Sequence, residues 1–171
     1  MYRKWDRLIA WSELLGGLAG LVVLLPVAAI QRVASLGPMY YLGAGLGFLV
    51  ASVAGVLLLR RKPFGRELSL VVQLLQVVQL TGFGWMIHYA TGIQVLIKMG
   101  PGTFQLSPGV NAAVWLAPTL IPADWTIGVN MFALWAAIYL ASGTVEQRAR
   151  DQNAIAEASK SQLSAVSSGP A

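Results

Sequence analysis

A long apolar segment that carries three glutamines, Leu68–Tyr89, constrains this chain more than any other feature of its sequence. As a helix it is long enough to cross a hydrocarbon core of about 30 Å. An unpaired amide in that core costs about 1–3 kcal/mol. One arc of the predicted helix holds most of its polar side chains, Ser69, Gln73, Gln76 and His88, with Gln79 just outside. The segment is therefore predicted to insert only with this face turned into a bundle of helices.

The chain as a whole is too apolar for an ordinary soluble domain, because 56% of its 171 residues are hydrophobic and only 11% are charged. We expect an all-α integral membrane protein. Four transmembrane helices are predicted, at 8–30, 39–59, 68–89 and 126–142. They make one domain over residues 1–145, and the polar segment 146–171 is a partly disordered cytoplasmic tail. Residues 1–29 also fit a cleaved signal peptide, although the length of the apolar run and Glu13 favour a retained helix.

The distribution of basic residues sets the predicted orientation. Ten of the twelve Lys and Arg residues fall on the side of the termini, and Arg32 and Lys98 fall on the other. Basic residues concentrate on the cytoplasmic side of membrane proteins, so both termini are predicted to be cytoplasmic in a bacterial inner membrane. The net charge of +5 has the same origin and is not read as a sign of nucleic-acid binding.

The segment 92–124 is predicted to form a loop on the outer side. Two short runs around Gly100-Pro101-Gly102 indicate a hairpin. The apolar run Val110–Leu120 is too short to span and is predicted to be interfacial or re-entrant. Asp124 is the predicted N-cap of the fourth helix.

Small residues at four-residue spacing indicate close helix packing, because helices in lipid adhere through close backbone approach. Two ridges are predicted from this spacing: Gly16 and Gly20 on the first helix, and Gly43, Gly47, Ala51 and Gly55 on the second. Such ridges suit a homo-oligomer or a larger membrane complex embedded in the lipid bilayer.

Groups that carry chemistry are scarce. With no cysteine and one histidine, the chain is not expected to hold a metal within itself, and no cofactor is expected, although haem ligation by His88 with a ligand from another subunit stays open. No nucleophile with its base is visible, so the chain is not predicted to be an enzyme. Glu13 is predicted to form a structural ion pair with Arg66 or Arg7 in preference to serving a proton relay.

Two hypotheses about function follow. The first is a non-catalytic subunit or scaffold that packs with itself or with larger membrane partners. The second is a binder or transporter of a small polar or amphiphilic ligand in a cavity between the third and fourth helices. In both, the polar side chains that matter are Gln73, Gln76, Gln79, His88 and Asn130. Interhelical hydrogen bonding is favoured over ligand binding for them.

Overall fold

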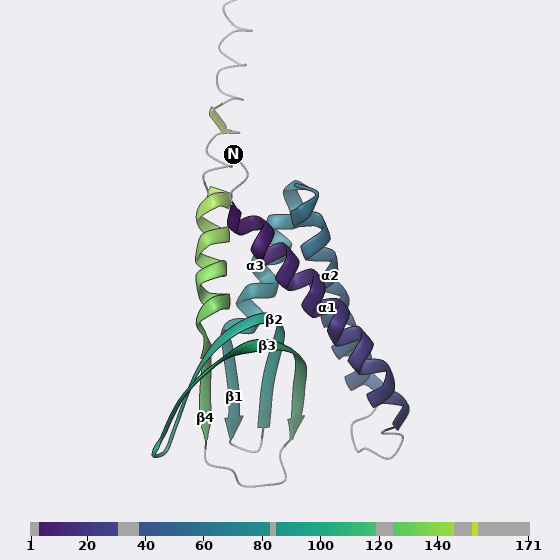
Figure 1. Ribbon diagram of the computed structural model, residues 1–171, viewed down its shortest axis with the longest axis vertical. Coiled ribbons are helices and arrows are strands. Elements are labelled where there is room, and N and C mark those ends of the chain that lie inside the picture. The colour runs from purple at the N-terminus through teal and green to yellow at the C-terminus, as the bar shows by residue number, and fades with distance from the viewer. Residues whose placement is uncertain (1–3, 31–37, 83–84, 119–124, 146–151, 154–171) are drawn as a thin grey trace, which may run out of the picture.

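The computed structural model describes residues 4–30, 38–82, 85–118, 125–145 and 152–153. These residues form four helices and a four-stranded antiparallel sheet (Figure 1), so the prediction of an all-α protein is wrong. The strands come from the end of the predicted third helix, the predicted outer loop and the start of the predicted fourth helix. Of the predicted tail 146–171, all but 152–153 lies outside the described residues.

The two N-terminal helices are α1 (Lys4–Ile30) and α2 (Pro38–Leu59), in the segments predicted as the first two spans. Within the described part of the chain, the helices long and apolar enough to cross a bilayer are these two, over Lys4–Leu24 and Tyr41–Leu59, by length and composition alone. They cross closely because a glycine lies at the contact. A Cβ at Gly55 would meet the carbonyl of Ala10, so only the missing side chain allows this approach.

The third helix is much shorter than predicted. α3 spans Pro63–Val77, with the proline at its first position, and the chain passes directly into β1 (Val78–Gly82). The helix predicted over 68–89 is therefore wrong beyond Val77. Two β-branched residues meet at this junction, and the backbone of Val78 is already extended, with φ −110 and ψ 131.

A long hairpin replaces the predicted outer loop. β2 (Trp85–Gly100) and β3 (Thr103–Pro118) pair without a break from Trp85↔Pro118 to Gly100↔Thr103. The turn lies where the sequence predicts it, and Gly102 there has a φ of +69 that favours glycine. The strands are far longer than predicted. The run Val110–Leu120 is strand as far as Pro118, so its interfacial or re-entrant assignment is wrong.

The predicted fourth helix begins as a strand. β4 (Thr126–Asn130) leads directly into a helix at Met131–Val145, called helix 131–145 below. The helix predicted over 126–142 is therefore wrong in its first five residues. Asn130 marks the change, because its Oδ1 accepts a hydrogen bond of 3.3 Å from the backbone N–H of Ala133, as an N-cap does. Asp124, the predicted cap, lies outside the described residues.

The sheet curls on itself. Its strand order is β1-β4-β2-β3, and β1 also pairs with β2. This is geometrically consistent because β2 is long and bent: its first residues pair with β1, as in Leu80↔Ile87, and its last residues pair with β4, as in Met99↔Ile127. The bend passes Gly92, which has a φ of +82. Figure 1 shows the hairpin arching over the shorter strands.

The helices bury polar residues together with apolar ones, and they expose apolar residues on their outer surfaces. In Figure 1, α1 and α2 descend beside the sheet, whereas α3 runs into β1 and helix 131–145 (light green) begins where β4 ends. Apolar exposed side chains recur at helical spacing on each of three helices: Trp5, Leu8, Trp11, Leu15, Leu18 and Val22 on α1; Leu42, Leu46, Leu49 and Val53 on α2; Met131, Trp135 and Ile138 on helix 131–145. The buried residues include Glu13, Gln73 and Gln76. Exposed apolar faces on three helices differ from the polar outer faces of a water-soluble helical domain.

Candidate functional site: a polar cavity on the inner face of the sheet

Buried polar residues between the helices are joined by hydrogen bonds, although Gln73 Oε1 has no partner among the described residues. The carboxylate of Glu13 accepts hydrogen bonds from Ser69 Oγ at 2.7 Å and from Gln73 Nε2 at 2.9 Å. The predicted ion pair of Glu13 with Arg66 or Arg7 is therefore not formed. Arg66 instead lies 3.7 Å from Asp6 and donates to the carbonyl of Leu140 at 3.1 Å, which also accepts a hydrogen bond from Thr144 Oγ1 at 2.9 Å.

Gln76 and Asn130 hold the sheet to the helices. Gln76 Nε2 donates to Thr91 Oγ1 at 2.8 Å, and its Oε1 accepts from the Thr91 backbone N–H at 2.9 Å. Asn130 Oδ1 accepts from the backbone N–H of Val95 at 3.1 Å as well as capping helix 131–145. The structure thus places Gln73, Gln76 and Asn130 in contacts within the chain, and none of them lines the cavity described next.

The other two predicted polar residues, Gln79 and His88, come together in a cavity of about 330 Å³. It lies on one face of the curled sheet, called the inner face below. Its walls are formed by Gln79 and Thr81 of β1, His88 and Lys98 of β2, Thr103 and Gln105 of β3, and Thr126 and Gly128 of β4. All four strands contribute, so the curl of the sheet is what encloses it.

The strand register explains how these side chains converge. Gln79 lies opposite Gly128, Gly128 lies opposite Lys98, and Lys98 lies opposite Gln105. Residues in such a row point to the same face of a sheet. Gly128 contributes no side chain, and the side chain of Leu96 packs over it, between the positions of Gln79 and Lys98 in this row.

Several polar atoms of this cavity have no hydrogen-bond partner among the described residues. Gln79 is only 4% exposed, yet both its Nε2 and its Oε1 are unpartnered. His88 Nε2 is also buried and unpartnered. A buried polar group without a partner costs about 1–3 kcal/mol. The amide of Gln79 contrasts with that of Gln76, which makes two hydrogen bonds within the chain.

The cavity is electropositive. Lys98 is the one residue with a formal charge at neutral pH among its lining residues, and no described acidic side chain lines it.

The glycine ridges serve contacts of different kinds. Gly16 and Gly20 of α1 lie against Gly92 of β2 and Phe48 of α2. On α2, Gly55 lies against α1, Ala51 is fully buried, and Gly47 lies against the ring of Tyr89 in β2. Around Gly43 there is open space. The ridges thus pack against strand β2 as well as against a helix, and the spacing alone did not indicate the contact with a strand.

Sequence reasoning missed six residues of the cavity, among them Lys98, which was assigned only to the outer side. The signal that would have found them is alternation at every second residue: Gln79 and Thr81, Thr103 and Gln105, Thr126 and Gly128. No group of three or more metal-binding side chains occurs within the described ranges. No protein-family model, curated protein or solved structure matches the chain.

Proposed function

We propose that this chain is a membrane-embedded binding protein whose sheet cavity takes a small ligand bearing an anionic group. The observation that carries the proposal is the buried amide of Gln79, unpartnered at both atoms, in a cavity that is also lined by Lys98. The site develops the second of the two functional hypotheses, but it lies on the sheet and not between the third and fourth helices.

Placement in a membrane is supported by surface chemistry. The exposed faces of α1, α2 and helix 131–145 are apolar, and contiguous exposed apolar surface of this extent marks contact with lipid or protein. The exposed basic residues Arg60, Arg61 and Lys62 gather at the turn between α2 and α3, as expected at a cytoplasmic boundary. The helices of suitable length and composition, α1 and α2, are consistent with this placement.

The anionic character of the ligand follows from the donors and charges in the cavity. Lys98 provides a cation, Gln79 provides a free amide donor, and threonine hydroxyls surround them. Carboxylates and phosphates accept hydrogen bonds from such groups, and charge-assisted bonds are about twice as strong as neutral ones. With no acidic side chain among the lining residues, nothing in the cavity opposes an anion.

A ligand-binding assay on detergent-purified protein tests the proposal. A ligand that binds only the folded state raises the melting temperature in proportion to its occupancy. We expect a saturable rise with acetate or inorganic phosphate and none with glycerol. Lys98→Gln should abolish the rise, whereas Lys62→Gln, the same change at an exposed lysine near the helical end, should preserve it. An unchanged response in Lys98→Gln would refute the assignment of the site.

The scaffold hypothesis stays a prediction. One observation favours a role of this kind: Gly43 has open space around it and lies beside Leu42 and Leu46, which are 67% and 61% exposed. A second helix would find room for close approach there. Cross-linking of a single cysteine at Gly43 in native membranes would support the hypothesis, and a monomeric protein with no cross-linked partner would contradict it.

A further inference from the structure

We propose that the curled sheet lies in the outer leaflet of the bilayer, with its outer face against acyl chains, and not in the aqueous space where the sequence predicts a loop. The outer face is the face opposite the cavity. This inference rests on the membrane placement proposed above. It adds that two segments of the chain cross the bilayer partly as helix and partly as strand.

The length of α3 requires such an addition. α3 has fifteen residues, which is about 22 Å and short of a core of about 30 Å. It passes without an intervening loop into the five-residue strand β1, and β4, also of five residues, passes in the same way into helix 131–145. A strand of five residues adds about 17 Å, for a total of about 39 Å. By comparison, α1 and α2 are about 40 Å and 33 Å long.

Hydrogen bonds between the sheet and the long helices fix the depth of the sheet. Tyr89 of β2 donates its hydroxyl proton to the carbonyl of Gly47, in the middle of α2, at 2.9 Å. The backbone N–H of Ile93 donates to Ser12 Oγ of α1 at 2.8 Å. If α2 crosses the bilayer, the bend of β2 is therefore near the bilayer centre, and the sheet extends outward from there.

The two faces of the sheet differ in polarity, as expected for a sheet at this depth in the bilayer. The inner face is polar, as described above. The outer face carries exposed apolar side chains: Phe104, Leu106, Val78, Met99, Ile87 and Ile127, at 72%, 59%, 56%, 46%, 44% and 38% exposure. A sheet with one face in water places polar residues on that face. Apolar residues outside and polar residues inside are the pattern of strands whose outer face meets lipid.

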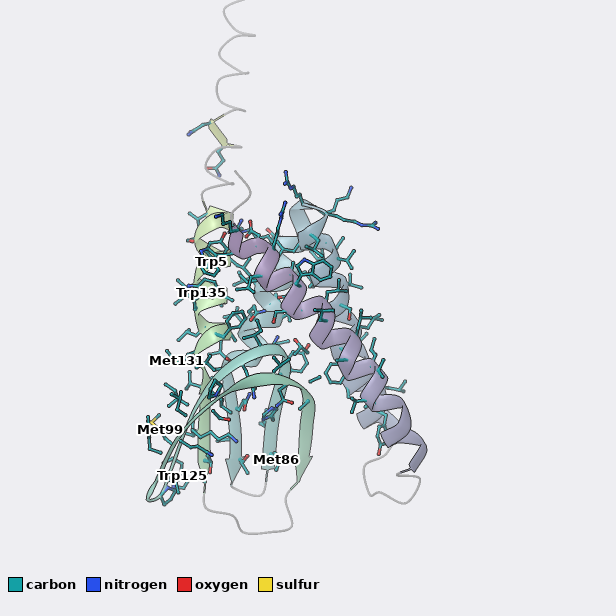
Figure 2. All side chains as sticks on the ribbon, viewed as in Figure 1. Trp5, Met86, Met99, Trp125, Met131 and Trp135 are labelled. Carbon is teal, nitrogen blue, oxygen red and sulfur yellow. The ribbon has the colours of Figure 1, made fainter. Side chains whose placement is uncertain are left out.

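The exposed apolar surface of the helices continues onto the outer face of the sheet, which identifies lipid as the material that contacts this face. On α3, the exposed residues Val71, Leu74 and Leu75 lead into Val78 at the start of β1. On the other side, Ile127 of β4 leads into Met131 and Trp135. The apolar surface of the helices thus passes without a polar boundary onto the sheet. The exposed Trp125 lies beyond it, with Met99, at the far end of the molecule from Trp5 (Figure 2), where an interfacial tryptophan is expected.

Backbone N–H and C=O groups at this depth must be hydrogen-bonded within the protein or shielded from lipid by it. The strands satisfy much of this requirement, because β2 pairs with β1, β3 and β4. α1 lies against both β2 and β3, and α2 lies against β3. The short strands β1 and β4 each pair on two sides or join a helix directly, so neither presents a long free edge.

Site-directed spin labelling tests the inference, and the absence of native cysteine makes single labels simple to place. Labels at Phe104→Cys and Ile127→Cys report on the outer face, and a label at Thr103→Cys reports on the mouth of the cavity. Val22→Cys on the exposed face of α1 is the control for membrane insertion. The probes are oxygen, which concentrates in lipid, and a water-soluble nickel chelate. The protein is reconstituted in phosphatidylethanolamine–phosphatidylglycerol vesicles.

We expect oxygen to relax the labels at 22, 104 and 127 more than nickel does, and the reverse at 103. If the label at 22 favours oxygen while those at 104 and 127 favour nickel, the sheet is in water; this inference is then refuted and the membrane placement stands. If the label at 22 also favours nickel, the membrane placement itself fails, and this inference fails with it. Lipid-like behaviour of the label at 103 would refute the polarity assigned to the two faces.

Discussion

Gln76 and Thr91 are joined by two hydrogen bonds that close a ring between α3 and β2: Nε2 to Oγ1 at 2.8 Å, and the Thr91 N–H to Oε1 at 2.9 Å. Both residues are 1% exposed. Among the described residues, no other side-chain amide forms hydrogen bonds with both the backbone and the side chain of a single strand residue. The bend of β2 therefore depends on a glutamine that sequence reasoning placed correctly inside the protein without identifying its partner.

Gln76→Leu should destabilise the fold without removing the ligand site. The substitution leaves the Thr91 N–H and hydroxyl buried without partners, at a cost of about 2–4 kcal/mol in the free energy of unfolding. Thermal unfolding in detergent would measure the loss, and Gln105→Leu, at an exposed position, is the control for a Gln-to-Leu change. A melting temperature equal to that of wild type would contradict the role assigned to Gln76.

Gln79→Leu should have the opposite effect, although it lies only three residues away. Its amide makes no hydrogen bond in the described chain, so replacement with an apolar residue removes an unpartnered group and should raise the unfolding free energy by about 1–2 kcal/mol. Anion binding should fall in the same variant, because a donor in the cavity is lost. Melting temperatures with and without phosphate measure both effects; a stable variant that still binds would remove Gln79 from the site.

Two glycine substitutions should have opposite effects on stability, because one glycine lies in a packed contact of the sheet and the other lies on an exposed helix surface. Gly92→Ala places a methyl group against Ser12 at a φ of +82, and should destabilise the fold by more than the roughly 1–2 kcal/mol of left-handed backbone alone. Gly43→Ala meets no other segment among the described residues and should stabilise α2 by about 0.5–1 kcal/mol. Unfolding measurements compare them. A Gly43→Ala protein that loses an oligomer would instead support the scaffold hypothesis.

The sequence was sufficient to predict an element of the structure where one local signal dominates. α2 is continuous, uncharged and bounded by Pro38 and Arg60, and its predicted limits differ from the observed ones by a single residue. The turn of the hairpin was equally clear, because Pro101-Gly102 permits few alternatives. The inward position of Gln73 and Gln76 followed from the cost of an unpaired amide and needed no knowledge of the fold.

The sheet was missed because hydropathy does not distinguish a buried helix from a strand. The segment after Val77 continues the same apolar composition, and its glutamine and histidine fit the helical wheel almost as well as an alternating pattern. The pairings that decide between the two are not local: β1 pairs with β4, which lies on the far side of the hairpin in the chain. The cavity depends on those pairings, so its residues could not be grouped from the sequence, and Lys98 appeared only as a charge on the outer side.

The shortness of α3 has an electrical consequence if the sheet lies in the outer leaflet. A hydrated recess on the inner face would carry the potential of the external solution down to the end of α3 that joins β1, about 22 Å from its other end. The membrane voltage would then fall across this thinner layer, and the local field would be steeper than in the surrounding lipid. Lys98 would sit outside that gradient, so an anion could reach it with little dependence on voltage.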